Sequence, residues 1–344
     1  MKRYLGVDLH RTQFVVCTRW ENQEQEIRQW RIAELAKFVE QLQPEDQIAV
    51  EAMGTTARFY DAVVGRVARV VVVNPHQFKV ISESVKKTDR NDAAALALYL
   101  EKDLLPEVRM KPKQNRELMH LAETRDLLVK QRSALKGKIN NLLAMQGIEL
   151  KREALSSKIA LERVLASPVR GMVQLELRVL VGQIRSLSES IAELDEQLEE
   201  EGQQLPGYEN LTSIKGIGSW SATVLLTVIG KISDFADENK LAAYLGLVPR
   251  ISNSNESERS GKITKQGNKL ARTALVQCGL VAKRYSPYLQ RFYKRIKQRR
   301  GGGKAKIALA RKLVKIVYDT LKNQWVFEDF PSFTLAAKTS QNNF

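Results

Sequence analysis

The first third of the chain alternates short apolar runs with amphipathic stretches. Apolar runs rich in strand formers lie at residues 4–7, 14–17, 47–50 and 70–73. Helical spacing of apolar residues follows at 32–42, 57–64 and 92–100. Strands that alternate with helices predict an α/β domain over residues 1–105.

Leucine recurs every seven residues in the middle of the chain, at 121, 128, 135 and 142. Between Leu177 and Leu198, leucine and isoleucine alternate spacings of three and four. This pattern is typical of a coiled-coil seam and predicts long helices over residues 106–202. Two such helices can pack as an antiparallel hairpin within one chain or pair between chains, and the spacing leaves both open.

The last third, residues 203–330, is predicted to be mostly helical with glycine punctuation. Lys215, Gly216 and Gly218 precede an apolar run and suggest a helix-hairpin-helix turn. Its glycines either let backbone N–H groups face a phosphate or simply let two helices pack. Residues 301–303 are all glycine and predict a flexible turn between two basic helices, and the polar tail 331–344 is expected to be disordered. The predicted fold class is therefore α/β plus all-α.

The charge is concentrated in the last third of the chain. Of a net +16, residues 203–344 supply 24 Lys/Arg against 9 Asp/Glu, and residues 259–318 hold 18 Lys/Arg and no carboxylate. A solvated helix face normally mixes charges of both signs, because like charges repel. Nucleic-acid phosphate is the counter-charge that this region predicts, although a generally basic proteome is an alternative.

Composition excludes several classes of protein. Two cysteines among 344 residues cannot build a disulfide framework or a four-cysteine zinc site, and the three histidines are widely scattered, so a His/Cys metal site is not expected. The sequence has neither an apolar run of membrane length nor a secretion signal at its start. We expect a cytoplasmic protein without membrane association.

Four carboxylates of the first region form a candidate metal site. Asp8 and Glu51 each follow an apolar strand, and such strand ends gather at one edge of an α/β sheet. Asp89 and Asp92 share one face of a helix through their i,i+3 spacing. Together they could hold two Mg²⁺ ions for phosphoryl transfer. Alternatively, Asp89 is a helix N-cap, Asp92 favours the helix dipole, and Asp8 and Glu51 are loop-entry acids.

A serine-rich polar segment follows Pro249 and Arg250, with serines at 252, 254, 257 and 260. Such a segment usually serves as a flexible connector. No histidine lies nearby in the sequence, so Ser-His-Asp chemistry is not expected, and a nucleophilic serine here would need arginines, phosphate electrostatics or a metal for activation.

In the order and spacing of these motifs, the chain resembles the DEDD-type transposases of bacterial insertion sequences that act as bridge-RNA-guided serine recombinases, and their relatives, the Piv-type DNA invertases. The motifs span nearly the whole chain: Gly6-Val7-Asp8, Glu51-Ala52-Met53-Gly54, Lys87 to Ala93, the glycine turn at 216–218, Ala243 to Pro249, and Gly261 to Asn268 leading to Arg272.

The resemblance implies a RuvC-like, RNase H-type N-terminal domain with Mg²⁺ on Asp8, Glu51, Asp89 and Asp92. It also implies a coiled coil that supports homodimers and tetramers, and a C-terminal transposase domain that supplies a serine nucleophile. The family's serine lies five residues after the motif proline, which gives Ser254, with Ser252 and Ser257 as alternatives. The implied partners are donor and target DNA and a bridge-type guide RNA.

Three functions follow as hypotheses. The first is a recombinase that forms a phosphoserine link to DNA, the second a metal-dependent nuclease or junction resolvase that uses water, and the third a nucleic-acid-binding protein without activity. The residues expected to contact nucleic acid are Lys215, Gly216, Gly218, Arg250, Lys262, Lys265, Lys269, Arg272, Arg299, Arg300 and Lys304.

Overall fold

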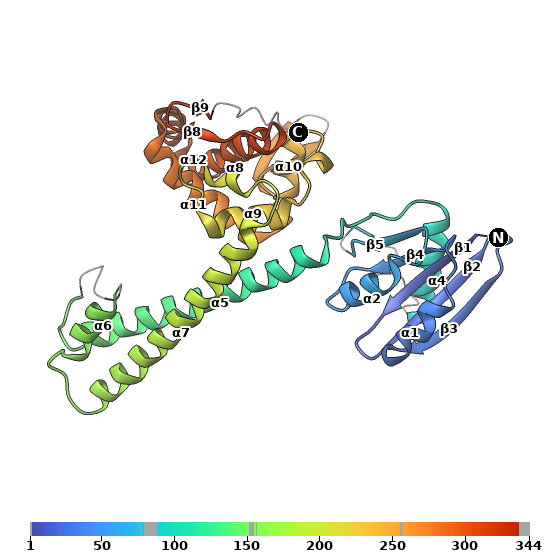
Figure 1. Ribbon diagram of the computed structural model, residues 1–344, viewed down its shortest axis with the longest axis horizontal. Coiled ribbons are helices and arrows are strands. Elements are labelled where there is room, and N and C mark those ends of the chain that lie inside the picture. The colour runs from blue at the N-terminus through green and yellow to red at the C-terminus, as the bar shows by residue number, and fades with distance from the viewer. Residues whose placement is uncertain are drawn as a thin grey trace, which may run out of the picture. The chain divides into compact units, whose positions relative to one another are not determined.

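The computed structural model describes residues 2–75, 77–78, 88–150, 155, 157–254 and 257–336, with the backbone alone for 251–254 and 257–260. The chain is mixed α/β, with a sheet in its N-terminal part and a mostly helical C-terminal part (Figure 1). It divides into two compact units, residues 1–113 and 114–344. None of the helices in the described part of the chain has the length and apolar character needed to cross a membrane.

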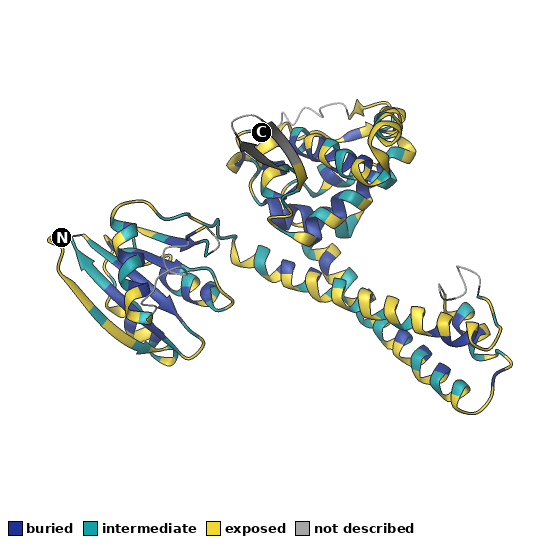
Figure 2. Ribbon diagram, turned by 180° about the vertical axis from the view of Figure 1, so that it is seen from behind, coloured by how far each residue is buried: buried dark blue, intermediate teal, exposed yellow. Residues whose placement is uncertain are grey.

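A five-stranded sheet in the order β3-β2-β1-β4-β5 forms the centre of the N-terminal unit (Figure 1). Its strands are β1 (Arg3–Leu9), β2 (Gln13–Trp20), β3 (Gln25–Arg31), β4 (Gln47–Glu51) and β5 (Arg69–Val73). The pairs β1–β2 and β2–β3 are antiparallel, whereas β1–β4 and β4–β5 are parallel. Four strands match the predicted ones. β3 lacks the apolar pattern because its residues are mostly polar and exposed (Figure 2), unlike those of β5 at the other edge of the sheet.

Helices cover both faces of this sheet. They are α1 (Leu35–Glu40) and α2 (Thr56–Val63) on one face and α4 (Asp89–Glu101) on the other. Leu5, Val7 and Leu9 of β1 belong to the core on the α1–α2 side. Because side chains alternate along a strand, Gly6 and Asp8 face α4.

Two long helices form an antiparallel hairpin at the start of the second unit. They are α5 (Lys113–Ala144) and α7 (Met172–Gln203), with the short α6 (Lys158–Leu165) between them. Their cross-links run in opposite directions along the two helices: Arg125 to Asp195 (2.8 Å), Arg132 to Ser188 (3.1 Å) and Lys138 to Glu176 (3.1 Å). Of the two arrangements that the leucine spacing leaves open, the structure has the one within a single chain.

A helical core completes the second unit. It comprises α8 (Tyr208–Thr212), α9 (Ser219–Ile229), α10 (Glu238–Tyr244), α11 (Lys269–Tyr285) and α12 (Pro287–Lys322). The backbone of α12 leaves helical geometry at Gly301, with φ 79°, so the predicted glycine turn is a kink between two helical segments. In the predicted tail, β9 (Thr334–Leu335) pairs with β8 (Phe327–Asp329), and residues 337–344 lie outside the described residues.

The serine segment forms a two-stranded antiparallel ribbon, where a polar loop was expected. Its strands are β6 (Pro249–Ser254) and β7 (Ser257–Ile263), with Ser254 opposite Ser257 at the tip. Polar residues without an apolar face carry no strand pattern, which is why the sequence suggests a connector. The side chains of Ser252, Ser254 and Ser257 lie outside the described part of the chain.

Candidate active site

Asp8 and Glu51 stand at matching positions on neighbouring parallel strands. The register of β1 and β4 pairs Val7 with Val50, and each acid is the next residue along its strand. Both residues lie at the carboxyl ends of their strands. Because side chains alternate between the two faces of a sheet, both carboxylates point to the face that α4 covers. Two sequence-predicted acids are therefore brought together by sheet register alone.

Helix α4 brings Asp89 and Asp92 to the same place. It rests so closely on β1 that a Cβ atom at Gly6 would stand 2.0 Å from the Ala93 carbonyl oxygen. The first turn of α4 therefore lies over the end of β1. The N-cap is Thr88, whose side chain accepts a hydrogen bond from the Asn91 backbone N–H (3.2 Å), so the alternative of Asp89 as N-cap is wrong.

The four acids interact electrostatically around Asp8. Asp8 and Asp92 are both buried, at 7% exposure each. Burial raises the pKa of Asp8 above its ordinary value. His10 opposes the shift, whereas Asp89, Asp92 and Glu51 add to it by charge repulsion. The predicted quartet is thus one cluster centred on a buried carboxylate.

His10 is a member of this cluster that the sequence reasoning missed. Its Nε2 lies 3.3 Å from Asp8 Oδ2 and 3.2 Å from Asp89 Oδ2. Ligand atoms of the three residues lie within 4.8 Å of one another. The expectation of no His/Cys metal site did not use the i,i+2 spacing of His10 from Asp8, the spacing that puts two residues on one face of a strand.

Thr56 is a second residue that the sequence reasoning missed. Its buried hydroxyl donates to the Glu51 carbonyl oxygen (2.6 Å) and accepts from the Met53 backbone N–H (3.0 Å). It thereby closes the turn after β4 and fixes the backbone that carries the Glu51 carboxylate. No sequence motif marks it beyond its place at the start of α2.

The donor set of this cluster fits a hard divalent cation. Carboxylate oxygens are the ligands that Mg²⁺ prefers, and mutually repelling buried acids are stabilised by a shared cation. A groove of about 430 Å³ adjoins the cluster, and its lining includes Asp89, Arg90 and Thr88.

The β6–β7 ribbon that carries the serines has a rigid base. Two motifs of the sequence form this base, Ala243 to Pro249 and Gly261 to Asn268. Gly246 (φ 69°) packs against Gln266, and Gly267 (φ 89°) against the Tyr244 carbonyl, at distances that leave no room for a Cβ atom. The Thr264 N–H donates to the Val248 carbonyl (2.9 Å). The strand that carries Ser254 thus starts from a fixed point.

Arg272 holds this base together. One of its guanidinium nitrogens, Nη1, donates to the carbonyl oxygens of Leu245 (3.3 Å), Gln266 (3.1 Å) and Gly267 (2.9 Å). Burial lowers the pKa of the guanidinium from its ordinary value. Among the predicted nucleic-acid contacts, Arg272 therefore has a clear structural task as well.

The glycine turn joins α8 to α9. Gly216 (φ 111°) packs against α11, where a Cβ atom would stand 2.6 Å from the Ala282 nitrogen. Gly218 is the N-cap of α9, and nothing lies within 4 Å of the Cβ position there. Packing explains Gly216, whereas the space beside Gly218 is open and Lys215 is exposed next to the turn.

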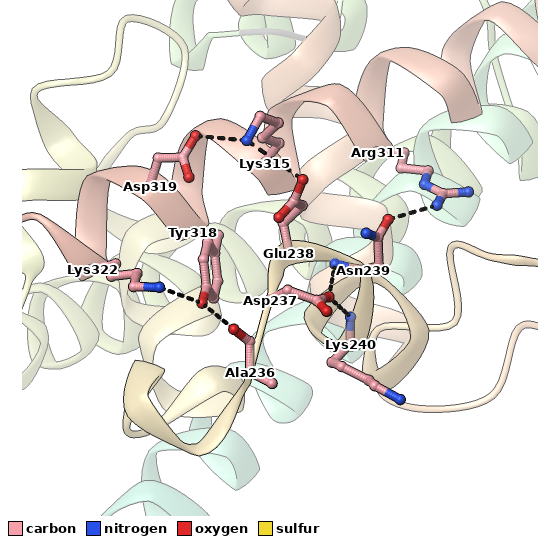
Figure 3. Close-up of polar contacts among 10 residues, drawn as sticks. All are labelled: Ala236, Asp237, Glu238, Asn239, Lys240, Arg311, Lys315, Tyr318, Asp319 and Lys322. Atoms are coloured by element: carbon pink, nitrogen blue, oxygen red, sulfur yellow. Dashed lines mark hydrogen bonds and ion pairs between the residues drawn. The ribbon is translucent and has the colours of Figure 1, made fainter.

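Most of the described basic side chains of the third region are exposed to solvent. Lys315 forms ion pairs with Glu238 (3.4 Å) and Asp319 (3.2 Å) (Figure 3). Among the described side chains of residues 259–318, no other lysine or arginine forms an ion pair. Arg311 donates to Asn239 instead (3.0 Å). The exposed predicted contacts are Arg250, Lys262, Lys265, Lys269, Arg299, Arg300 and Lys304.

Comparison with known proteins accounts for this combination of parts. A family model for DEDD transposases of the IS110 type, described as "Transposase", matches residues 5–146, and the model "Transposase IS116/IS110/IS902 family" matches residues 208–294. The first range contains all four acids, and the second contains the glycine turn and the serine ribbon. The chain belongs to the IS110/IS116 family of DEDD transposases.

Relatives align along nearly the whole transposase. The transposase for insertion sequence element IS1111A of Coxiella burnetii is 28% identical, covering 94% of this chain and 90% of its own. The pilin gene-inverting protein of Moraxella bovis is 28% identical, covering 95% and 98%. A probable family 20 transposase of Pseudomonas aeruginosa is 27% identical, with 93% of each chain covered.

Membership of this family makes the chain an enzyme that acts on DNA, cutting strands and transferring them. The reading as a binding protein without activity is therefore excluded. The family also accounts for the acidic cluster, since DEDD transposase domains are typically metal-dependent.

Proposed function

We propose that the transposase cuts and rejoins DNA with a serine nucleophile that works beside a pair of Mg²⁺ ions. The observation that carries the metal part is the convergence of Asp8, Glu51, Asp89 and Asp92 on one buried position. Bound Mg²⁺ would supply positive charge to the phosphate oxygens as the bond is broken. The mixed sheet with acids at the ends of β1 and β4 supports a RuvC-like, RNase H-type domain.

Ser254 is the proposed nucleophile. Its Oγ would form a bond to a DNA phosphorus while one P–O bond to deoxyribose breaks, and the proton lost by the serine hydroxyl is balanced by the proton gained by the departing deoxyribose oxygen, which leaves as a hydroxyl. The hydroxyl of a second strand would then reverse the step and release the serine. The anchored base of the ribbon supports this role, because a nucleophile must be held in place.

The C-terminal unit is proposed to hold nucleic acid through its exposed lysines and arginines. The run 259–318 has no carboxylate, and among its described side chains one cation, Lys315, forms an ion pair, which supports a phosphate partner. The predicted residues Lys262, Lys265 and Lys269 lie on or just after the serine ribbon. These proposed phosphate contacts lie at or just beyond the base of the ribbon whose tip carries the proposed nucleophile.

We further infer that a bridge-type guide RNA selects the donor and target DNA, and that the enzyme works as a homodimer that assembles to a tetramer. These inferences derive from the family resemblance. In such an assembly the acids of one subunit would face the serine of another. A related protein named for inverting a pilin gene supports strand exchange, because an inversion rejoins every end that it cuts.

One experiment tests the covalent step. Purified protein is incubated with Mg²⁺, RNA transcribed from the flanking non-coding DNA, and labelled target DNA, and the products are run on a denaturing gel with and without protease. We expect a protease-sensitive shifted band that Ser254→Ala abolishes and Asp8→Asn also abolishes. Ser252→Ala and Ser257→Ala are matched controls on the same ribbon, and each should keep the band.

The alternative is a RuvC-like nuclease or junction resolvase that hydrolyses DNA with water. The acidic cluster alone supports it as well as it supports the recombinase. In the same experiment, the hydrolytic alternative predicts cleaved DNA without attached protein, and full cleavage by Ser254→Ala. Either result would contradict the serine mechanism and would remain compatible with the proposed metal site.

A further inference from the structure

His10 is placed against the acidic cluster by the turn between β1 and β2. Its backbone N–H donates to the Gln13 carbonyl oxygen (2.8 Å), which closes the turn. It follows Asp8 by two residues, so its side chain leaves the chain on the α4 side, the side of the acids. Its position is thus set by the same strand that positions Asp8.

The Nε2 atom of His10 lies between two carboxylates without a hydrogen bond to either. It is 3.3 Å from Asp8 Oδ2 and 3.2 Å from Asp89 Oδ2. It is shielded from solvent and has no hydrogen-bond partner among the described residues. An imidazolium that donated to a carboxylate would align its N–H with one oxygen at about 2.7–2.9 Å. An ordinary ion pair therefore does not account for this geometry.

A shared metal ion does account for it. Ligand bonds of about 2.0–2.2 Å, at angles of about 90–110°, set neighbouring ligand atoms about 3.0–3.5 Å apart. Both distances from Nε2 fall in this range, and one ligand atom from each of Asp8, His10 and Asp89 lies within 4.8 Å of the others. The lone pair of Nε2 would then point at the ion, between the two oxygens.

We propose that His10 is a nitrogen ligand of one divalent ion, shared with Asp8 and Asp89, and that this position prefers a first-row transition-metal ion to Mg²⁺. The inference rests on the proposed metal site and deepens it. Imidazole binds transition metals better than it binds Mg²⁺, which prefers oxygen. We expect His10→Ala to weaken Mn²⁺ binding about tenfold or more and Mg²⁺ binding by less.

The test uses the full-length protein with Mn²⁺ alone, at less than one ion per chain, and pulsed EPR. The expected result is a nitrogen modulation on the bound Mn²⁺ that changes when the histidines of the unchanged chain carry ¹⁵N. His10→Ala and His10→Gln should both lose it. The control is His120→Ala, because His120 pairs with a carboxylate elsewhere (Glu123, 3.8 Å) but is highly exposed, and this variant should keep the signal.

The possible outcomes distinguish a failure of His10 as a metal ligand from a failure of the proposed metal site itself. Bound Mn²⁺ without nitrogen modulation, released by Asp8→Asn, would overturn the role of His10 and leave the carboxylate site standing. Nitrogen modulation that survives His10→Ala would assign it to another histidine and overturn the proposal. Absence of any Mn²⁺ binding sensitive to Asp8→Asn would overturn both the ligand and the proposed metal site.

Discussion

Gly6 of β1 and Ala93 of α4 touch through their backbones: a Cβ atom on Gly6 would stand 2.0 Å from the Ala93 carbonyl oxygen. This contact sets the height of α4 above the sheet. Because Asp89 and Asp92 lie in the first turn of α4 and Asp8 lies two residues after Gly6, the same contact sets the spacing of the acids.

Gly6→Ala is therefore expected to destabilise the transposase by about 1–3 kcal/mol and to weaken Mn²⁺ binding, because α4 must move away from β1. Denaturant unfolding and a Mn²⁺ titration measure the two effects. The control is Gly65→Ala, where nothing lies within 4 Å of the Cβ position and both quantities should stay near wild type. If Gly6→Ala is destabilised but binds Mn²⁺ as well as wild type, then the packing of α4 on β1 does not determine the spacing of the acids.

The raised pKa of Asp8 predicts how stability depends on pH without metal. Between its ordinary and raised pKa values the folded protein binds more protons than the unfolded chain, so stability falls as pH rises through that window. Asp8→Asn removes the free-energy cost of ionising this buried carboxyl. In EDTA, the melting temperature of the variant should exceed that of wild type at pH values above the raised pKa, and should approach that of wild type at pH values below the ordinary pKa.

Excess Mg²⁺ should reverse the order of the two proteins at neutral pH, since only the wild-type carboxylate gains from the cation. Thermal melts across a pH series, with EDTA or with Mg²⁺, record both effects. An Asp8→Asn protein that is less stable than wild type in EDTA at every pH would contradict the assigned repulsion among the acids.

Arg272 and the ribbon lysines should respond differently to salt. Arg272 is engaged by three carbonyl oxygens, so Arg272→Ala should lower stability by about 1.5–3 kcal/mol and leave the slope of log affinity against log salt nearly unchanged. The pair Lys262→Ala with Lys265→Ala should instead keep stability and flatten the slope by about one unit per phosphate contact. Filter binding to DNA at several salt concentrations measures the slopes. A slope that falls for Arg272→Ala alone would make it a phosphate contact.

The antiparallel hairpin predicts a coupling between Arg125 and Asp195. Two nitrogens of the Arg125 guanidinium donate to the Asp195 carboxylate: Nε to Oδ1 (2.8 Å) and Nη2 to Oδ2 (3.0 Å). A double-mutant cycle with Arg125→Ala and Asp195→Ala should give a coupling of about 0.5–1 kcal/mol. Because the pair lies within one chain, the coupling should not vary with protein concentration. A coupling that vanishes on dilution would indicate pairing between chains.

Much of the fold follows from local patterns. Apolar runs mark four of the five strands because their side chains are buried on both faces of the sheet, and heptad spacing marks both long helices. The edge strand β3 and the serine ribbon carry no such pattern, since their stability comes from pairing with neighbours and not from buried faces of their own.

The residue types and spacing of this chain determined which acids were candidates, where the basic charge lies, and which family the motifs resemble. Tertiary structure alone decided how those groups meet. The register of β1 and β4 puts Asp8 beside Glu51, and the close contact of Gly6 with Ala93 brings the first turn of α4, with Asp89 and Asp92, near these two acids. It also turned His10 toward the cluster and gave Arg272 three carbonyl partners. Such relations depend on distances between segments far apart in the chain, which local periodicity does not encode.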